Sequence, residues 1–255
     1  MLRFKSLGSG SSGNATLIEA GGLAPFRLLV DCGLGIRVLA RRLAEAGLGL
    51  DDLDAIFITH EHGDHIGCAA QVVRQHHVPI WMSEGTWRGC GEPALNSWLR
   101  VTADGDRIDL GCMELCPFTV PHDALEPLQL SVDDGQTQLG ILTDLGHVPE
   151  HVLAHLKGCS ALLLECNHDA QLLSESAYPG FLKQRVGGDM GHLSNRQAAE
   201  VAAHLKPHLR QVVAAHLSRQ NNRPELAQAA LSEVLGEHIE ICVAHPASGT
   251  PWMRA

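Results

Sequence analysis

Short apolar runs rich in β-branched residues alternate along the chain with segments of helical period. The runs predict β-strands, because β-branched and aliphatic side chains favour extended backbone. These strands are predicted over residues 27–31, 55–59, 138–144, 161–165, 211–215 and 239–243. Helices are predicted over residues 35–46, 149–156, 194–205 and 224–235. The last two begin with Ser194 and Pro224, which are common helix-start residues.

The first half of the chain is richer in predicted strands, and the second half alternates strand with helix. That order predicts an α/β protein with mixed sheets covered by helices, in a single domain over residues 1–255. Residues 8–13 read Gly-Ser-Gly-Ser-Ser-Gly between two strand-like runs. They predict a tight loop whose amides and hydroxyls could contact a phosphate.

No apolar run in the chain reaches the roughly 18 residues of a membrane span. Residues 1–7 are strand-like and lack the charged-then-apolar profile of a signal peptide. We therefore expect a cytoplasmic protein with no membrane partner.

The amino-acid composition is that of an ordinary folded protein except for its histidine content. The chain of 255 residues has 45% hydrophobic and 19% charged residues, which is typical of a folded protein. Its formal net charge of −10 argues against indiscriminate binding to nucleic acid or anionic lipid. The eight cysteines form no C-x-x-C pair, so we expect buried free thiols. Histidine is the outlier, with 16 residues.

Three histidines and two acidic residues fall within residues 60–65, which read His-Glu-His-Gly-Asp-His directly after a predicted strand. Residues two apart in extended backbone point to the same side, so His60 and His62 can converge on one ion. A turn at the glycine can bring Asp64 and His65 to a neighbouring point. Imidazole and carboxylate are ligands of Zn²⁺, Mn²⁺ and Fe²⁺. A solvated polar loop is the alternative, but five titratable groups so close would repel, so the motif favours two divalent ions.

Three further candidate ligands each follow an apolar strand-like run, namely His122, Asp144 and His216. An open sheet presents functional groups at the carboxyl ends of its strands. Singly, each could be an ordinary surface residue. Repeated after the motif at residues 60–65, the pattern favours metal ligation.

The spacing His-x-His-x-Asp-His resembles the signature of the metallo-β-lactamase superfamily. Asp31-Cys32-Gly33 and Thr143-Asp144-Leu145-Gly146 are similar to two further motifs of that superfamily. The resemblance covers the whole chain and implies a four-layer αββα sandwich. It also implies one ion held by His60, His62 and His122 and a second held by Asp64, His65 and His216, with Asp144 bridging and Asp31 supporting the metal loop.

The second half of the chain resembles ribonuclease Z, with an acid at a strand end, a Gly-His-Leu-Ser loop and a strand-end His-Leu-Ser. This resemblance implies that His192 acts beside the scissile phosphate, and Glu165 is a candidate to orient it. The motifs at residues 8–14, 121–124, 167–169, 192–195, 216–218 and 221–224 resemble those of the YycJ/WalJ group, a bacterial branch regarded as 5′-to-3′ exonuclease-like on DNA. The candidate substrate contacts are His168, Ser11, Asn14, Ser194 and Asn195.

The charge is unevenly distributed along the chain. Residues 183–223 contain seven basic residues and only two acidic ones. A local basic patch beside His192 and His216 suits a phosphate backbone, whereas ordinary helix-surface charge is the alternative. The basic residues are Lys183, Arg185, Arg196, Lys206, Arg210, Arg219 and Arg223.

These features predict a dinuclear metal-dependent hydrolase, a phosphodiesterase or nuclease in which a metal-bridging hydroxide attacks the phosphorus. Asp64 would orient the nucleophile or take its proton, and His192 would stabilise charge or protonate the leaving oxygen. Nucleic acid or another phosphodiester is the expected partner. The stretch between Asp144 and His192 is too short for the β-CASP insertion of related nucleases.

Two other classes of function stay open at this point. A thioesterase or lactonase of the glyoxalase II type would share the metal motif and act on carbonyl substrates. A noncatalytic metal-binding protein would keep the fold, but the complete ligand set argues against it. The sequence is equally compatible with Zn, Mn or Fe, with DNA or RNA, and with a monomer or an oligomer.

Overall fold

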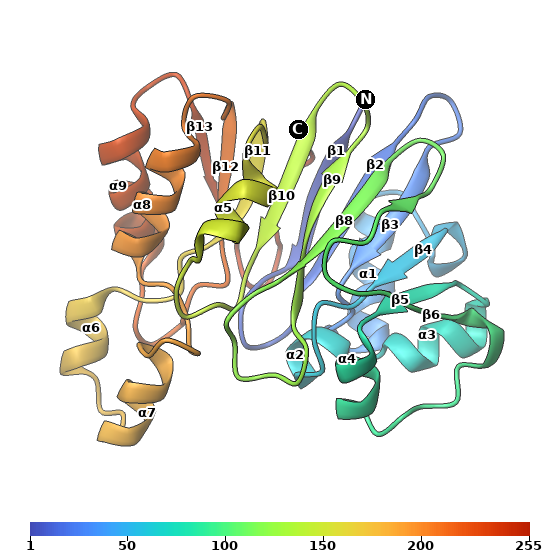
Figure 1. Ribbon diagram of the computed structural model, residues 1–255, viewed down its shortest axis with the longest axis horizontal. Helices are drawn as coiled ribbons and strands as arrows, with labels where there is room; N and C mark the ends of the chain where they lie inside the picture. Colours follow the sequence, from blue (N-terminus) through green and yellow to red (C-terminus); the bar gives the residue numbers. More distant parts are fainter.

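The computed structural model describes residues 1–255 and contains two seven-stranded sheets packed face to face (Figure 1). The first sheet has the order β14 (Met253–Arg254), β1 (Arg3–Gly8), β2 (Ala15–Ala20), β3 (Phe26–Val30), β4 (Ala55–Phe57), β5 (Ile80–Met82) and β6 (Leu99–Val101). The second has the order β13 (Glu240–Val243), β12 (Gln211–Ala215), β11 (Ala161–Glu165), β10 (Gln138–Leu142), β9 (Leu128–Asp133), β8 (Glu114–Thr119) and β7 (Ile108–Asp109).

Helices cover the outer faces of both sheets, so the predicted αββα layering is confirmed (Figure 1). The first sheet carries α1 (Ile36–Glu45) and α3 (Ala69–His76), and the second carries α5 (Glu150–Leu156), α8 (Asn195–Leu205) and α9 (Pro224–Leu235). The shorter helices are α2 (Gly63–Ile66), α4 (Glu84–Gly89), α6 (Ala170–Glu175) and α7 (Gly180–Val186), with 3₁₀ turns at Leu50–Asp52 and Asn96–Trp98. None of the helices has the length and apolar character that crossing a bilayer requires.

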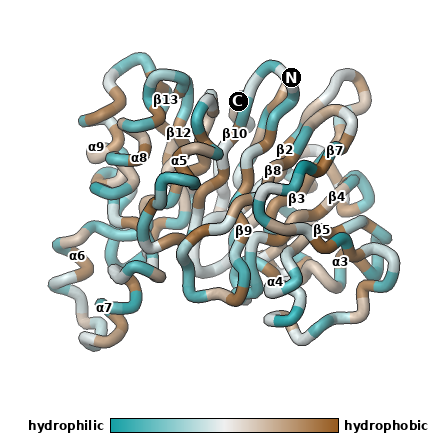
Figure 2. Tube along the Cα trace, viewed as in Figure 1, coloured by the Kyte–Doolittle hydropathy of each residue, from teal (hydrophilic) through white to brown (hydrophobic).

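The strands of the second sheet are buried on both faces. In β11, Leu162 and Leu164 pack against the core that includes α8 and α9, whereas Leu163 between them packs into the core shared with the first sheet. Successive residues of a strand point to opposite faces, so a strand covered on both sides is apolar throughout. Figure 2 shows apolar residues concentrated along the strands and polar residues on the connecting loops.

Three predicted strands end earlier than their apolar runs. The strand predicted over residues 27–31 ends at Val30, the one over 55–59 ends at Phe57, and the one over 138–144 ends at Leu142. In each case the last residues leave the ladder and enter the loop that carries site residues. The strand and helix types assigned from the sequence are otherwise confirmed, with ends shifted by a residue or two.

The cysteines are free, as expected, but the expectation that they are buried is only partly right. Cys32, Cys159 and Cys166 are buried, and the other five are half-buried. Two of the half-buried ones, Cys116 on β8 and Cys242 on β13, lie at or next to an edge of the second sheet.

The candidate residues follow strands that all end at the same edge of the sandwich. In the first sheet, β1 and β3 both run antiparallel to β2, and β4 runs parallel to β3. In the second, β10, β11 and β12 are parallel, and β8 runs the same way because β9 is antiparallel to both β8 and β10. The loops after β1, β3, β4, β8, β10, β11 and β12 therefore meet at one edge, which is where open sheets bind ligands.

Three of these loops lock together through their backbones. The amide of Asn14 donates to the carbonyl of Asp64 at 2.8 Å, and the amide of Gly33 donates to the carbonyl of Asn14 at 2.9 Å. The amide of Cys32 donates to the carbonyl of His65 at 2.7 Å. A Cβ atom on Gly33 would overlap the Asp64 carbonyl, so only glycine allows this approach.

Replacing Gly33 by alanine should therefore lower the free energy of unfolding by about 3 kcal/mol, because rigid backbone must move to admit the methyl group. Urea unfolding at equilibrium measures this change. Gly35→Ala is the matched control, since a Cβ there meets nothing within 4 Å. It should cost about 1 kcal/mol or less, through a weaker start to α1. Equal losses in the two variants would contradict the interlocked loops.

Candidate metal centre

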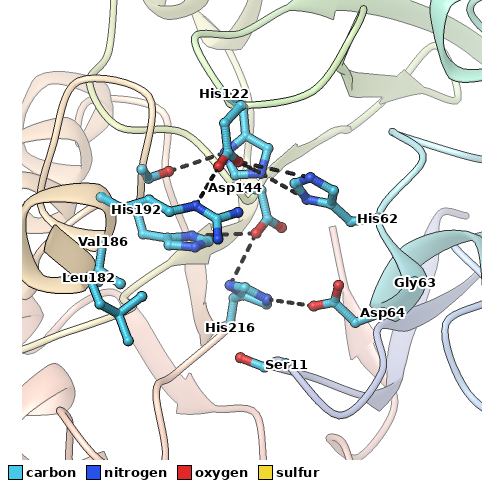
Figure 3. Close-up of a pocket in the computed structure, with 13 residues that line it drawn as sticks. Ser11, His62, Gly63, Asp64, His122, Asp144, Leu182, Val186, His192 and His216 are labelled. Atoms are coloured by element: carbon cyan, nitrogen blue, oxygen red, sulfur yellow. Dashed lines mark hydrogen bonds and ion pairs between the residues drawn. The ribbon is translucent and has the colours of Figure 1, made fainter. Parts of the chain in front are cut away.

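A cleft of about 400 Å³ opens at this edge, and it is lined almost entirely by polar residues. Histidine and carboxylate side chains from both sheets point into it from several directions (Figure 3). Neither sheet alone provides the complete group. The predicted site residues that line the cleft are Ser11, His62, Asp64, His122, Asp144, His192 and His216.

One set of three histidines consists of His60, His62 and His122, and Figure 3 shows the last two at the upper part of the cleft. The Nδ1 atom of His62 lies 3.1 Å from Nε2 of His60 and 3.3 Å from Nε2 of His122. The opposite ring nitrogens are held from behind: Nδ1 of His122 is 3.2 Å from the carbonyl of Gly191, and Nδ1 of His60 is 3.0 Å from Thr59 Oγ1. A carbonyl only accepts, so Nδ1 of His122 carries the hydrogen and Nε2 is free to bind an ion.

A second set consists of Asp64, His65 and His216. The Oδ2 atom of Asp64 lies 3.6 Å from Nε2 of His216 and 3.8 Å from Nε2 of His65. Buried carboxylates hold both rings from behind. Asp31 Oδ2 is 2.7 Å from Nδ1 of His65, and Glu165 Oε1 is 3.0 Å from Nδ1 of His216. Each Nδ1 therefore donates, and each Nε2 points toward Asp64.

Asp144 lies between the two sets. Its Oδ2 atom is 3.0 Å from Nε2 of His65, and the ligand atoms of His60, His65 and Asp144 lie within 4.8 Å of one another. Its Oδ1 atom is 3.4 Å from Nδ1 of His216. The structure thus brings together all seven residues for which the sequence predicts metal ligation.

The arrangement passes a direct test for metal ions. Asp144 Oδ2 and His216 Nε2 are buried without a well-aligned hydrogen bond, and their nearest partners, His65 Nε2 at 3.0 Å and Asp64 Oδ2 at 3.6 Å, are themselves predicted ligands. Buried polar atoms without a partner are rare in folded proteins and require an explanation. A divalent cation satisfies both atoms, and a donor set of imidazole nitrogen and carboxylate oxygen without thiolate suits Zn²⁺, Mn²⁺ or Fe²⁺.

The protonation of the histidines differs between the two sets. Burial lowers the pKa of His60 well below its usual value, and the neighbouring ring of His65 lowers it further. Burial also lowers the pKa of His65, but the carboxylates of Asp144 and Asp31 outweigh it and raise the pKa well above the usual range. For His216, burial is outweighed by Asp144, Asp64 and Glu165, and the pKa rises to about 10. In the metal-free chain the second set therefore holds protons that an ion must displace.

His192 belongs to neither set of three. Its Nδ1 atom lies 2.8 Å from Glu165 Oε1 and 3.4 Å from Asp144 Oδ1, and its side chain is 22% exposed in the cleft. Burial lowers the pKa of His192, but the charge and hydrogen bond of Glu165 outweigh it and raise the pKa. Burial raises the pKa of Glu165, but His192 and His216 hold it at about 2. Glu165 is fully buried, so it acts by positioning the two rings and does not touch a substrate.

Three site residues have left-handed backbone conformations. Asp31, Asp144 and His216 have φ angles of 62°, 56° and 54°. Side chains other than glycine, asparagine and aspartate rarely adopt such angles, and they cost energy where they occur. Each of these residues follows the end of a strand, and the turn directs its side chain into the site. Aspartate adopts this conformation more readily than most residues, so the backbone cost is clearest at His216.

Four predicted substrate contacts do not line the cleft. Asn14 turns inward, where its Nδ2 atom lies 3.0 Å from Nε2 of His65. Ser194 caps α8 by accepting from the Gln197 amide, and the side chain of Asn195 pairs with that of Asn222. His168 is only 4% exposed, and its backbone pairs with the segment that begins α8. These residues support the loops around the cleft, whereas Ser11 lines it as predicted.

The basic segment over residues 183–223 does not form one patch. Arg196 pairs with Glu200, and Lys206 donates to the Val234 carbonyl. Arg210 precedes β12, at the end of the strand opposite the metal centre. Only Arg185 lines the cleft, and Arg219 and Arg223 line cavities beside it. Basic residues that are close together in the sequence therefore lie on separate surfaces of the folded chain.

Sequence reasoning also missed two contributors to the site. Thr59 links the carboxylate of Asp31 to the ring of His60, and its only signal was its position directly before the histidine motif. Asp123 lines the cleft and accepts from Nε of Arg185 at 2.7 Å. Its signal was its position directly after His122.

The αββα sandwich and the histidine–aspartate cluster at its carboxyl edge define a metallohydrolase of the metallo-β-lactamase fold. Residues 26–217 match the family model described as the beta-lactamase superfamily domain. The chain therefore belongs to the metallo-β-lactamase superfamily and is a metal-dependent hydrolase, as the resemblance of its motifs implies.

Two relatives and one solved structure are similar to this chain over most of its length. Exodeoxyribonuclease YycJ of Bacillus anthracis is 33% identical over 240 residues, which cover 92% of this chain and 90% of that protein. Exodeoxyribonuclease WalJ of Streptococcus pneumoniae serotype 2 is 32% identical over 241 residues, which cover 92% and 88%. The crystal structure of YhfI, a metallo-β-lactamase-fold protein of Bacillus subtilis, has a TM-score of 0.76 and 16% identity over 100% of this chain and 99% of that chain. The last similarity concerns the fold alone.

The stability of the metal-free protein should fall as the pH rises from about 6.5 to about 10. The pKa of His216 is about 10 in the folded chain and about 6.5 in an unfolded one, so the folded state binds this proton more tightly. The resulting stabilisation is complete below the unfolded pKa and is lost as the pH rises through the folded pKa.

Urea unfolding of chelator-treated protein across this pH range measures the effect. The metal-loaded protein is the control, and its stability should vary less because an ion replaces the proton. A metal-free stability that stays level or increases over the range would refute the assignment.

Proposed function

We propose that the chain hydrolyses the phosphodiester bonds of nucleic acid as a two-ion exonuclease that degrades DNA from its 5′ end. The observation that carries this proposal is His192, an imidazole at the cleft that is not one of the seven predicted ligands and whose Nδ1 atom lies 2.8 Å from the buried Glu165 and 3.4 Å from Asp144. The charge and hydrogen bond of Glu165 raise the pKa of His192, which favours the cationic form of the ring. A cation beside two metal ions suits the anionic oxygens of a phosphodiester better than the neutral carbonyl of a thioester or lactone. The similarity to two exodeoxyribonucleases over 92% of the chain supports the same substrate class.

We assign one ion to His60, His62 and His122 and a second to Asp64, His65 and His216, with Asp144 shared. Zn²⁺, Mn²⁺ or Fe²⁺ ions held there would lower the pKa of a water molecule and offset charge on the phosphoryl oxygens. The buried groups behind the histidines keep their ring orientations fixed, so the chain has little reorganisation to undergo when the charge of the reaction develops.

Asp64 is the group that receives the proton of the attacking water. Burial raises its pKa, but the neighbouring rings of His216 and His65 outweigh burial and lower it. Asp64 is therefore ionised at neutral pH. Its side chain is 25% exposed and lines the cleft, so it can reach a water molecule as well as the second ligand set.

His192 is the group that meets the leaving oxygen. Because Nδ1 is held by Glu165, the Nε2–H of the cationic ring is the donor available to the substrate. It can neutralise a phosphoryl oxygen during attack and transfer its proton to the departing oxygen. Arg185 adds a guanidinium to the same cleft, held by Asp123.

A polarity-resolved nuclease assay tests the proposal. Single-stranded and double-stranded DNA and RNA, each labelled at the 5′ or 3′ end, are incubated with protein loaded with Mn²⁺ or Zn²⁺. The expected result is a labelled mononucleotide as the first product from 5′-labelled DNA, and gradual shortening of 3′-labelled DNA. Turnover of thioesters or lactones with no cleavage of any nucleic acid would overturn the proposal in favour of the glyoxalase II class.

Replacing His192 by alanine should spare the metal content but lower the hydrolysis of bis(p-nitrophenyl) phosphate about 10²-fold, the usual contribution of a general acid. His192 lies outside both ligand sets, so metal analysis separates its role from ligation. His238→Ala is the matched control, because this exposed histidine lies after α9 and away from the cleft. Unchanged turnover in His192→Ala would exclude the assigned role.

A further inference from the structure

A second cavity adjoins the metal cleft. It has a volume of about 220 Å³ and lies among residues 9–12 after β1, Tyr178 between α6 and α7, and residues 217–220 after β12. We call it the serine-loop cavity. Ser11 lines both this cavity and the metal cleft. In Figure 3, Ser11 lies at the end of the cleft that holds Asp64 and His216. A chain-like substrate bound in the cleft can therefore continue past Ser11 into the serine-loop cavity.

The charge of the serine-loop cavity differs from that of the protein as a whole. The chain has a net charge of −10, yet no aspartate or glutamate lines this cavity. Arg219 lines it and donates from Nη2 to the hydroxyl of Ser12 at 2.9 Å, and it pairs with no carboxylate. An unneutralised guanidinium among hydroxyls is a suitable partner for a phosphate group.

The absence of acidic residues extends to a neighbouring cavity. A further cavity of about 430 Å³ shares Leu217, Ser218 and Arg219 with it and adds Arg223 and His245. No carboxylate lines that cavity either. The two cavities form a continuous surface that leads away from the metal ligands, and the only charged side chains that line it are the arginines Arg219 and Arg223.

The position of the serine-loop cavity relative to the metal ligands is fixed. The hydroxyl of Ser9 accepts from the backbone amide of His216 at 2.7 Å. The side chain of Asn14 accepts from the amide of Gly10 at 2.8 Å, and the same side chain contacts His65. The loop over residues 9–12 is therefore tied to both His65 and His216. A group bound in the cavity would lie at a constant distance from the reacting atoms.

Tyr178 gives this cavity an aromatic surface. It is the only tyrosine in the chain, and it lies half-buried in the connection between α6 and α7. Aromatic rings bind nucleobases by stacking, which needs a base that is not paired or stacked in a duplex. Arginine, hydroxyl groups and one aromatic ring in a single cavity match the phosphate and base of one nucleotide.

We propose that the serine-loop cavity binds the nucleotide next to the scissile phosphodiester in an unpaired nucleic acid strand. Arg219 and the hydroxyls of Ser11 and Ser12 hold its phosphate, and Tyr178 stacks on its base. This inference rests on the proposed nuclease function and adds a subsite that selects polynucleotides over small phosphodiesters. Arg223 extends the contact to the following phosphate.

A charge reversal tests the subsite. Arg219→Glu is compared with wild type on oligo(dT) and on bis(p-nitrophenyl) phosphate, which has no neighbouring nucleotide. The variant should lose about tenfold or more in kcat/KM on oligo(dT) relative to its change on bis(p-nitrophenyl) phosphate. Arg210→Glu is the matched control, since this exposed arginine lies at the opposite end of β12. It should change neither value by more than about twofold, the effect of one distant, screened charge.

Two further measurements separate the phosphate contact from the stacking contact. For Arg219→Ala, the slope of log kcat/KM for oligo(dT) against log salt concentration should decrease in magnitude by about 0.7, the value for one phosphate contact on a single strand. Tyr178→Ala should lose about tenfold in kcat/KM on oligo(dT), while Tyr178→Phe should retain most of it because the ring remains.

The outcomes distinguish this inference from the proposed function. Wild-type protein that cleaves neither substrate overturns the proposed function and the subsite with it. Wild-type protein that cleaves both, with Arg219→Glu affecting both equally or neither, overturns the subsite alone. Equal losses in Arg219→Glu and Arg210→Glu would also overturn it, because they would show a general charge effect.

Discussion

The carboxylate of Asp31 accepts from the backbone amide and hydroxyl of Thr59 at 2.9 Å, and its Oδ2 atom lies 2.7 Å from Nδ1 of His65. The Thr59 hydroxyl in turn contacts Nδ1 of His60. One buried carboxylate therefore orients a histidine in each of the two ligand sets, directly in one case and through a hydroxyl in the other. The rest of the site depends on this contact, because a histidine binds a metal well only when its ring is held with the lone pair facing the ion. Asp31 itself has a left-handed backbone conformation at the end of β3, with a φ angle of 62°. The interlocked loops around Gly33 hold the backbone in this conformation.

Burial gives this site its chemistry as well as its shape. Burial away from water disfavours charged groups. In the metal-free chain this cost is offset because the ionised carboxylates lie beside protonated imidazoles. Asp144 and Glu165 stay ionised because His65, His192 and His216 lie beside them. Divalent ions replace the protons of the second ligand set without changing the surrounding carboxylates. The hydrogen bond of His192 with Glu165 raises its pKa, and its ring is accessible from the cleft.

The structure brings the predicted ligands together, and their positions could be inferred from the sequence because their signals are local. Each predicted ligand lies in the 60–65 motif or follows an apolar strand, and parallel strands bring their carboxyl ends to one edge of the fold. Four of the five predicted substrate contacts do not line the cleft. The direction of a side chain in a loop depends on contacts that are distant in sequence, which a local pattern does not show. Asn14 faces His65, 51 residues away, and Arg185 meets Asp123 across 62 residues. Neither pairing has a signature in the local pattern. For the same reason the basic segment of the sequence is divided among separate surfaces of the fold.

In the proposed mechanism, hydrolysis of a phosphodiester requires two ions, one held by each ligand set. Stoichiometric titration of the metal-free protein with Mn²⁺ or Zn²⁺, followed by the hydrolysis of bis(p-nitrophenyl) phosphate, shows whether both ions are needed. We expect activity to rise to a plateau at two ions per chain, and direct metal analysis at the plateau to give the same ratio. A plateau at one ion per chain, or full occupancy by two ions without any diesterase activity, would refute the two-ion mechanism.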